Sequence, residues 1–231
     1  MPVVTMSGTI ASGAREIGQA AASLLGTDFV DQQLLVDAAR RLGVPIDVMA
    51  DRDERCSSLG ERLAGVLRGF LERSAAAGDP LTGTSGLEVL LGRSYAEMAL
   101  EREEPHVSDS LYMKTMTAII RDLGERGDIV VLGRGSQMIL RDLPGALHVL
   151  TLAPAELRVE RLAKREGISQ EEAARRLQDS DRARPAFYRK FWNVDVSDPN
   201  LYDITLETSR LTYEVGAELV AAAARARAAS G

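Results

Sequence analysis

Apolar residues follow two alternating patterns along the chain. Apolar runs typical of strands buried on both faces of a parallel sheet occupy residues 128–132 and 146–152, a short apolar run occupies residues 3–6, and a last strand is expected over residues 202–206. Between them, apolar residues recur at helical spacing, as over residues 15–25, where Gly26 favours a helix end. A shorter strand is expected at residues 28–30. Strands alternating with helices predict an α/β fold in which helices flank a parallel sheet.

The remaining segments read mostly as helices. Asp31 is placed to cap a helix that reaches residue 43, and Ser108 or Asp109 to cap a longer one that ends near residues 124–127. Further helices are expected over residues 59–71, 87–102, 136–141 and 211–229, and residues 81–86 read as a mobile loop. Pro154 opens a basic segment of two or three helices, with expected interruptions at residues 166–167 and at Pro185.

Composition narrows the class of protein. The chain has 231 residues, 45% of them apolar, yet no stretch approaches the roughly 20 apolar residues of a membrane span. The N-terminus enters a strand directly, without the basic region of a signal peptide. Cys56 is the only cysteine, and His106 and His148 match no metal-ligand spacing. We therefore expect a cytoplasmic enzyme or binding domain that does not insert into a membrane.

Charge is unevenly distributed. The net charge of −6 argues against broad nucleic-acid binding, but residues 158–190 carry ten Lys or Arg against six acids. A local basic surface on an acidic protein suits a small polyanion. The same charges also fit a solvated helix pair with i, i+4 ion pairs.

A glycine-bounded loop follows the first strand. The sequence Gly8-x-x-x-x-Gly13 fits the spacing of a phosphate-binding loop, but Ala14 stands where that motif has Lys, and Arg15 where it has Ser or Thr. The loop is therefore either a variant phosphate cradle with Arg15 as its cation or an ordinary strand-to-helix turn. Two further polar loops, residues 133–135 and 208–210, follow other strands. In a parallel sheet all three meet at the edge where ligands bind.

These residues resemble the cytidylate kinase-like family of P-loop nucleoside monophosphate kinases. The resemblance lies in GTIASGAREIG at residues 8–18, VVLGRGSQMIL at 130–140, and the run from Ala153 through Arg165. It continues in DRARPAFYRKFW at residues 181–192 and DPNLYDITLETSRL at 198–211, and no match is found in residues 45–104. The resemblance implies a single P-loop domain with a core of residues 1–44, 105–157 and 198–231, a helical insertion over 45–104 and a helical lid over 158–197.

The resemblance also implies roles for individual residues. The β-phosphate of a donor such as ATP would be wrapped by Gly8, Ser12, Gly13, Ala14, Arg15 and Glu16. Arg134 would hold the phosphate of the acceptor nucleotide, which Asp181 and Arg184 would face, and Arg182 would reach the transferred phosphoryl group. Arg161, Lys164 and Arg165 would lie at the lid entrance, and Ser209 and Arg210 under the adenine.

Each basic residue also has a plainer interpretation. Arg134 fits a surface ion pair with Asp142, and Arg182 and Arg184 fit solvated helix charges. The rings of Tyr188, Phe191 and Trp192 fit the core of the lid helices better than a platform for a base.

The departures from the motif concern the cation and the metal. Ala14 and Arg15 remove the usual Lys and the hydroxyl that ligates Mg²⁺, and Leu132 stands where a cytidylate kinase has Asp. We expect Mg²⁺ to arrive with ATP, held largely by phosphates and water, with Thr9, Ser12 or Asp109 as weaker candidates for contact.

The resemblance implies transfer of the γ-phosphate of ATP to a nucleoside monophosphate, with CMP or dCMP as the leading acceptor. Two alternatives stay open at this point: a nucleotide-binding protein without turnover that signals or scaffolds through residues 45–104, and a kinase for another small acceptor. The apolar face of that insertion fits either a core or an interface between copies of the chain.

Overall fold

The computed structural model describes residues 1–42, 54–76, 83–99 and 107–230. Within these residues, five strands form one sheet in the order β2-β3-β1-β4-β5. The strands are β1 (Val3–Gly8), β2 (Asp28–Val30), β3 (Ile129–Leu132), β4 (Ala146–Leu152) and β5 (Ile204–Glu207). β1 pairs in parallel with β3 and β4, and β4 with β5. The predicted parallel sheet is therefore confirmed, and the carboxyl ends of its strands share one edge.

The helices fill the intervals that the periodicity predicts. They are α1 (Ala14–Leu25), α2 (Gln32–Leu42), α3 (Glu54–Ala76), α4 (Gly83–Gly92), α5 (Tyr95–Ala99), α6 (Val107–Arg126), α7 (Ser136–Ile139), α8 (Ala155–Glu166), α9 (Gln170–Trp192) and α10 (Tyr213–Ser230), with a 3-10 turn at Pro199–Leu201. Both expected caps of the first helices hold: Gly26 is left-handed after α1, and the Asp31 carboxylate accepts the Leu34 N–H at 2.9 Å.

The chain divides into two compact units, each with its own interior. The first contains residues 1–29, 94–101 and 127–231, and the second residues 30–93 and 102–126. The expected boundaries of core, insertion and lid stay a prediction. The candidate nucleotide-binding residues named from the sequence all belong to the first unit, whereas Asp109, a weaker candidate for contact with Mg²⁺, belongs to the second.

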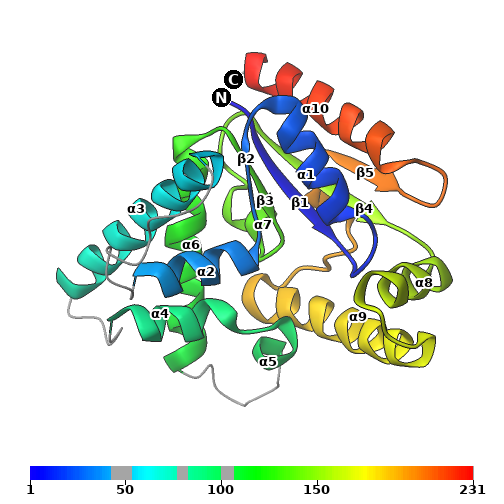
Figure 1. The fold of residues 1–231 in the computed structure, drawn as a ribbon, viewed down its shortest axis with the longest axis horizontal. Coiled ribbons are helices and arrows are strands. Elements are labelled where there is room, and N and C mark those ends of the chain that lie inside the picture. Colours follow the sequence, from blue (N-terminus) through cyan, green and yellow to red (C-terminus); the bar gives the residue numbers. More distant parts are fainter. Residues whose placement is uncertain (43–53, 77–82, 100–106, 231) are drawn as a thin grey trace. The chain divides into compact units, whose positions relative to one another are not determined.

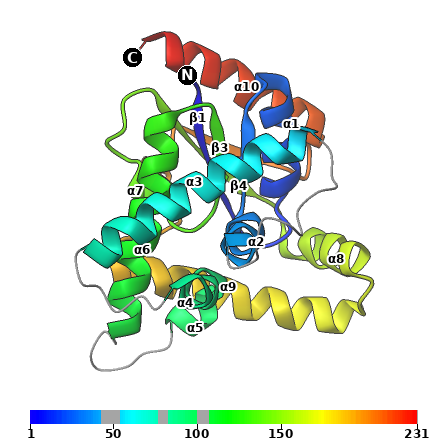
Figure 2. The same ribbon diagram turned by 60° about the vertical axis from the view of Figure 1, so that its left-hand side comes forward.

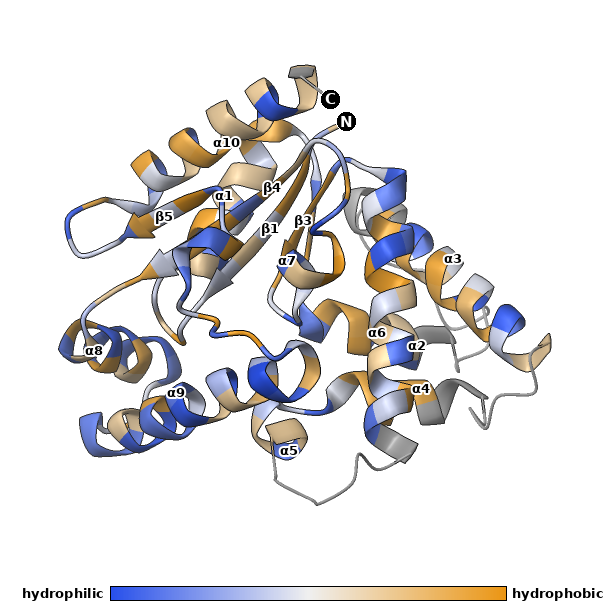
Figure 3. Cartoon of the chain, turned by 180° about the vertical axis from the view of Figure 1, so that it is seen from behind, coloured by the Kyte–Doolittle hydropathy of each residue, from blue (hydrophilic) through white to orange (hydrophobic). Residues whose placement is uncertain are grey.

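The core of the first unit lies between the sheet and two helices. Met6, Val130 and Val149 from three strands are buried with Ile17 of α1 and Val220 of α10. Figure 1 shows α1 and α10 on one face of the sheet, and Figure 3 shows α7 on the other. Figure 3 also shows strands that are largely apolar and α8 and α9 that are largely polar on their outer sides. One expected inward residue, Leu24, is instead 47% exposed.

The second unit corrects the loop expected at residues 81–86. Helix α4 begins at Gly83, so residues 83–86 are helical where a loop was expected; residues 77–82 lie outside the described residues. Leu87, Leu90 and Leu91 bury their side chains, and the Gln32 side-chain amide donates to the Leu91 carbonyl at 3.0 Å. Burial and this contact at the helix end outweigh the weak helix propensity of the glycines and Thr.

The helix expected over residues 87–102 is interrupted after Gly92. Ser94 begins a new helix: its hydroxyl accepts the Glu97 N–H at 3.2 Å while the Glu97 carboxylate accepts the Ser94 N–H at 2.6 Å. This reciprocal capping box starts α5. Residues 100–102 lie outside the described residues.

Helix α6 begins at Val107, so Ser108 and Asp109 lie in its first turn rather than capping it. The Asp109 carboxylate pairs with the Arg93 guanidinium at 2.9 Å. Helix α7 is shorter than expected, ending at Ile139, and Pro154 is the N-cap of α8 rather than its first residue.

Helix α9 runs through Pro185, where an interruption was expected. Proline removes one helical hydrogen bond and crowds the preceding turn, at a cost of about 3 kcal/mol. Ala183 and Arg184 before it and Phe187 and Tyr188 after it are all buried, and their packing holds both halves of the helix in line. The expected break at residues 166–167 is confirmed, because Gly167 adopts a left-handed conformation after α8.

No helix within the described residues combines the length and apolar character needed to cross a bilayer.

Candidate functional site

The loop between β1 and α1 has a compact, tightly packed backbone. A Cβ on Gly8 would overlap the Thr151 hydroxyl and the Ser12 hydroxyl, so only glycine fits there. Ala11 and Gly13 both have positive φ, at 59° and 90°. Such left-handed residues occur in backbone nests, where successive N–H groups converge on an anion.

The first turn of α1 presents its N–H groups at the end of this loop. Gly13 is the N-cap residue, and no described side chain caps the helix. Uncapped N–H groups at the positive end of a helix favour a phosphate. The loop therefore has the two features of a phosphate cradle, glycines at the points of close approach and a helix N-terminus behind them.

Side chains from three other segments brace this loop. The Ser12 and Thr151 hydroxyls lie 2.7 Å apart, and the Thr208 hydroxyl donates to the Ser12 carbonyl at 2.9 Å. Arg161 donates to the Thr208 hydroxyl and carbonyl at 2.8 and 2.7 Å, and its guanidinium lies 5.2 Å from the ring centroid of Tyr213. Thr151 lies near the carboxyl end of β4 and Thr208 directly follows β5, so these two residues tie the loop to β4 and to the residues after β5.

The charged residues near the loop differ in exposure. Arg15 and Lys164 are exposed, and Glu16 is half-buried with the Arg165 guanidinium 3.8 Å from its carboxylate. That contact joins the first turn of α1, expected at the donor phosphate, to the last turn of α8, expected at the lid entrance.

Arg134 lies in the turn after β3, the strand next to β1. The Gly133 N–H donates to the Met6 carbonyl at 2.8 Å, which ties this turn to β1. Arg134 is only 6% exposed and has a φ of 58°. Its N–H donates to the Tyr95 hydroxyl at 2.7 Å, and its guanidinium lies 5.2 Å from the ring centroid of Tyr95. Its burial contradicts the interpretation as a surface arginine paired with Asp142, which is itself exposed.

The side chain of Arg184, on α9, reaches β1. It is 6% exposed, donates to the Ser7 hydroxyl at 2.8 Å and to the Tyr202 hydroxyl at 3.4 Å, and lies over the ring of Tyr188. It is therefore not a solvated helix charge. Arg182, two residues earlier, is exposed.

Asp181 has a partner that sequence reasoning missed. Both of its oxygens accept hydrogen bonds from the buried Arg158, at 2.9 and 2.7 Å, and the Arg158 Nε donates to the Ala153 carbonyl at 3.1 Å. The bidentate pair joins the start of α8 to the middle of α9. A charged residue in the first turn of a basic helix gave no sequence signal that distinguished Arg158 from its neighbours.

A cluster of aromatic rings includes Tyr95 and Tyr188, which lie beside the buried Arg134 and Arg184. Phe187 packs against Tyr95 with ring centroids 4.8 Å apart, and also against Tyr188, Phe191 and Trp192. The prediction that the α9 aromatics form a packed core is confirmed. Burial raises the pKa of the Tyr188 hydroxyl, which donates to the Gln137 side chain at 3.2 Å.

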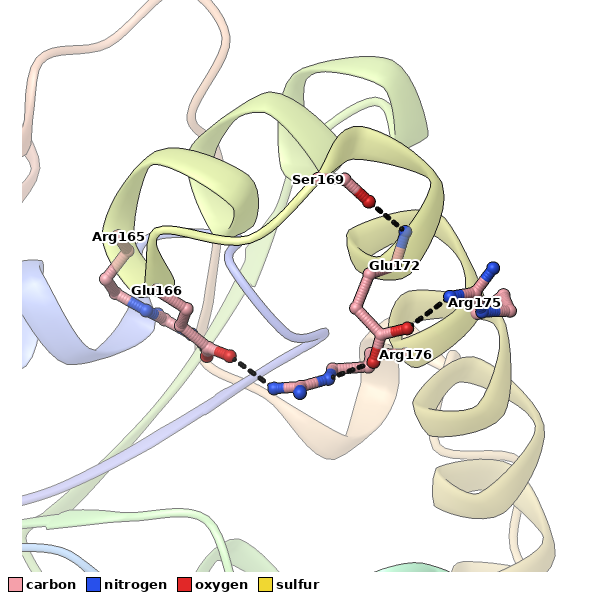
Figure 4. A network of polar contacts seen from close by, with 6 residues as sticks. All are labelled: Arg165, Glu166, Ser169, Glu172, Arg175 and Arg176. Carbon is pink, nitrogen blue, oxygen red and sulfur yellow. Dashed lines mark hydrogen bonds and ion pairs between the residues drawn. The ribbon is translucent and has the colours of Figure 1, made fainter.

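The tip between α8 and α9 carries a network of exposed ion pairs. Figure 4 shows Glu172 between Arg175 and Arg176, with Arg176 also reaching Glu166 at 2.8 Å. The hydrogen bonds from Arg175 and Arg176 lower the pKa of Glu172. The alternative interpretation of the basic segment, ion pairs along solvated helices, is therefore confirmed for these residues. It does not apply to Arg158, Arg161 and Arg184, whose partners are Asp181, Thr208 and Ser7.

The remaining candidates lie at the exposed turn after β5. The Ser209 hydroxyl donates to Glu207 at 2.6 Å and lowers the pKa of that carboxyl. Ser209 and Arg210 are both exposed.

Two of the side chains named as candidates for contact with Mg²⁺ have other partners. Among the described residues, no cluster of three or more His, Cys, Asp or Glu side chains could hold a metal ion. The Ser12 hydroxyl is engaged with Thr151, and Asp109 is paired with Arg93. The glycine cradle at Gly8 and Gly13 fits a polyphosphate, the group that would bring Mg²⁺ with it.

Comparisons with known proteins agree with this geometry. A family model described as the cytidylate kinase-like family matches residues 3–210. A cytidylate kinase of Methanopyrus kandleri is 39% identical over 98 residues, which cover 39% of this chain and 51% of the relative. A cytidylate kinase of Aeropyrum pernix is 29% identical over 137 residues, covering 59% of this chain and 76% of the relative. The match thus spans about half the length of the first relative.

A solved structure has the same fold. The crystal structure of an uncharacterized protein from Eubacterium ventriosum covers 98% of this chain and 100% of its own, with a TM-score of 0.63 and 13% identity. At this identity the likeness concerns the fold alone.

Proposed function

Because the family model matches residues 3–210, the chain belongs to the cytidylate kinase-like family, and we propose that it transfers the γ-phosphoryl group of ATP to a nucleoside monophosphate. CMP or dCMP is the leading acceptor, since the relatives from Methanopyrus kandleri and Aeropyrum pernix are cytidylate kinases.

The observation that carries the proposal is the grouping of anion-binding elements at one sheet edge. The loop of residues 8–13 follows β1, buried Arg134 follows the adjacent β3, and buried Arg184 reaches Ser7 in β1. Phosphoryl transfer between nucleotides brings several negative charges together, and a protein contributes mainly position and countercharge. Arginine suits both tasks because its planar fork binds phosphate oxygens in pairs and stays charged.

In this proposal the loop binds the donor. The N–H groups of the loop and of the first turn of α1 surround the β-phosphate, with Gly8 and Gly13 allowing close approach. Arg15 supplies the charge that Lys supplies in the usual motif, since Ala14 and Arg15 replace that Lys and the following hydroxyl. Mg²⁺ bound with ATP would supply countercharge to the phosphates.

Arg134 holds the acceptor phosphate, and the lid residues complete the site. Arg182 is exposed on α9 and is free of the burial that fixes Arg184, so it suits a group that approaches the transferred phosphoryl only when the lid closes. Closure matters because water would otherwise accept the phosphoryl group. The left-handed Gly167 between α8 and α9 provides a joint for that movement.

The test is a panel of nucleoside monophosphates assayed with Mg-ATP for ADP formation. CMP or dCMP should give the highest rate, and Arg15→Ala and Arg134→Ala should each lower kcat/KM by about 100-fold. Arg175→Ala is the matched control, because Arg175 is exposed and paired with Glu172 of its own helix, and it should leave the rate unchanged. Absence of ADP with every nucleotide would overturn the proposal. Turnover with another small phosphate- or hydroxyl-bearing compound instead would keep the chemistry and change the acceptor.

A second candidate is a nucleotide-binding protein without turnover. The replacement of the motif Lys and hydroxyl by Ala14 and Arg15 favours it. Titration calorimetry separates the two functions: tight ATP binding without ADP formation supports the second, and absence of nucleotide binding rejects both.

A further inference from the structure

Helix α5 lies against α9. Residues 94–101 belong to the first unit, whereas α4 and α6 belong to the second. The Tyr95 ring packs on Phe187 at 4.8 Å, and the Lys190 ammonium donates to the Met98 carbonyl at 2.9 Å. Figures 1 and 2 both show α5 beside α9. A short segment is thus fixed to the lid helix by a ring contact and a charged hydrogen bond.

Tyr95 contacts Arg134 in two separate ways. Its hydroxyl accepts the Arg134 backbone N–H at 2.7 Å, and its ring lies under the guanidinium at 5.2 Å. The first contact supports a backbone with a φ of 58°, which is unfavourable for a residue with a side chain. The second fixes the direction of the side chain. Backbone and guanidinium are therefore both oriented by one residue.

The Tyr95 hydroxyl takes up none of the guanidinium donors of Arg134, because it bonds to the main chain rather than to the side chain. The guanidinium carbon lies over the Tyr95 ring, whose negative face attracts a cation. The ring therefore holds the charged group at this place beside the turn after β3.

We infer that Tyr95 is a positioning residue that presents the Arg134 guanidinium to a phosphate-bearing ligand, and that it links this arginine to the lid helix through Phe187. The inference rests on the proposed role of Arg134 in holding the acceptor phosphate. It assigns a function to a residue within residues 45–104, where the sequence shows no match to the family.

Three variants separate the contacts. Tyr95→Phe removes the hydroxyl and keeps the ring, and Tyr95→Leu removes both. Phe191→Leu removes a ring from the same cluster, where Phe191 packs on Phe187 and Trp192, and serves as the matched control for lost aromatic packing. Melting temperatures of all variants check that each one folds.

Titration calorimetry with CMP gives the primary readout, with cytidine as the probe that lacks the phosphate. Tyr95→Leu should raise the Kd for CMP and the acceptor KM about tenfold, with the KM for ATP unchanged. Tyr95→Phe should have a smaller effect of the same kind, and Phe191→Leu none. In the Arg134→Ala background, Tyr95→Leu should cause no further loss of CMP affinity, because the two residues act as a unit.

Several results would overturn the inference. These are unchanged CMP affinity in Tyr95→Leu, an equal loss in Phe191→Leu, or additive losses in the double variant. If wild-type protein binds CMP but makes no ADP, the proposed function fails. The CMP affinities of the Tyr95 and Phe191 variants then still decide the role of Tyr95. If wild-type protein binds neither CMP nor inorganic phosphate, both are rejected.

Discussion

Gly13 is held in the left-handed region with the ring of Tyr213 where its side chain would lie. A Cβ at this position would be 2.7 Å from Tyr213 Cε1, and φ is 90°. Gly13→Ala should therefore lower the free energy of unfolding by about 3 kcal/mol and weaken ATP binding. Gly26→Ala is the matched control at the other end of α1, since Gly26 has a φ of 67° with nothing within 4 Å.

Denaturant titrations of both variants make the comparison. The control should lose only about 1 kcal/mol, the cost of a side chain at positive φ, and keep its ATP affinity. Equal losses in the two variants would show that Tyr213 moves aside and that the loop is not tightly packed.

His148 should make the stability of the folded chain depend on pH. Its Nδ1 lies 2.8 Å from the Thr5 hydroxyl, and burial lowers the pKa of His148, although the Asp203 carboxylate acts in the opposite direction. The unfolded chain then binds a proton at a higher pH than the folded chain. The contribution of His148 to stability is complete above its ordinary pKa of about 6.5 and is lost as the pH falls below it.

His148→Asn should remove that dependence while keeping a polar group near Thr5. Unfolding free energies at about pH 7.5 and about pH 5.5 should differ more in the wild type than in the variant. The same difference in both proteins would mean that other groups carry the acid sensitivity.

Among the helices, α8 and α9 are joined by the bidentate ion pair of Arg158 and Asp181. Arg158 is 7% exposed, so Asp181→Asn leaves a buried guanidinium without its carboxylate. The substitution should therefore lower the free energy of unfolding by about 2 kcal/mol. Glu172→Gln breaks an exposed pair at the tip of the same helices and should change the melting temperature little. If the acceptor KM rises in Asp181→Asn while the melting temperature is unchanged, Asp181 contacts the substrate instead.

The elements recovered from sequence are those whose signal is local. β1, β3 and β4 read as continuous apolar runs because both faces of a parallel sheet are buried, and Gly26 and Gly167 mark helix ends by their conformational freedom. The passage of α9 through Pro185 depends on burial on both sides of the proline, which one stretch of sequence does not reveal.

The candidate site also contains residues that local sequence predicts and residues that it does not. The glycine loop and Arg134 follow strands and were located by order along the chain. Tyr95 and Arg158 gain their roles from partners 39 and 23 residues away, so their own sequence context does not predict them. The capping box of Ser94 and Glu97 was a local signal for the start of α5, and it places Tyr95 in the first turn.

For the whole molecule, nucleotide binding should appear as a change in stability. A ligand that binds only the folded chain stabilises it by about 2.7 kcal/mol at a concentration of 100 times its Kd. Mg-ATP should therefore raise the melting temperature of the wild type. Arg15→Ala should melt at the wild-type temperature without nucleotide, since Arg15 is exposed, and lose most of the shift. An unchanged shift in the variant would exclude Arg15 as the cation of the loop.

Trp192 is the single tryptophan of the chain, and its indole occupies the space that a Cβ on Gly135 would need. The last turn of α9 is thereby pressed against the residue that follows Arg134. If α9 moves as part of the proposed lid, its tilt must part the indole from this glycine and admit water to the ring. The emission maximum of the native protein would then report lid movement directly, without a label and without a substitution.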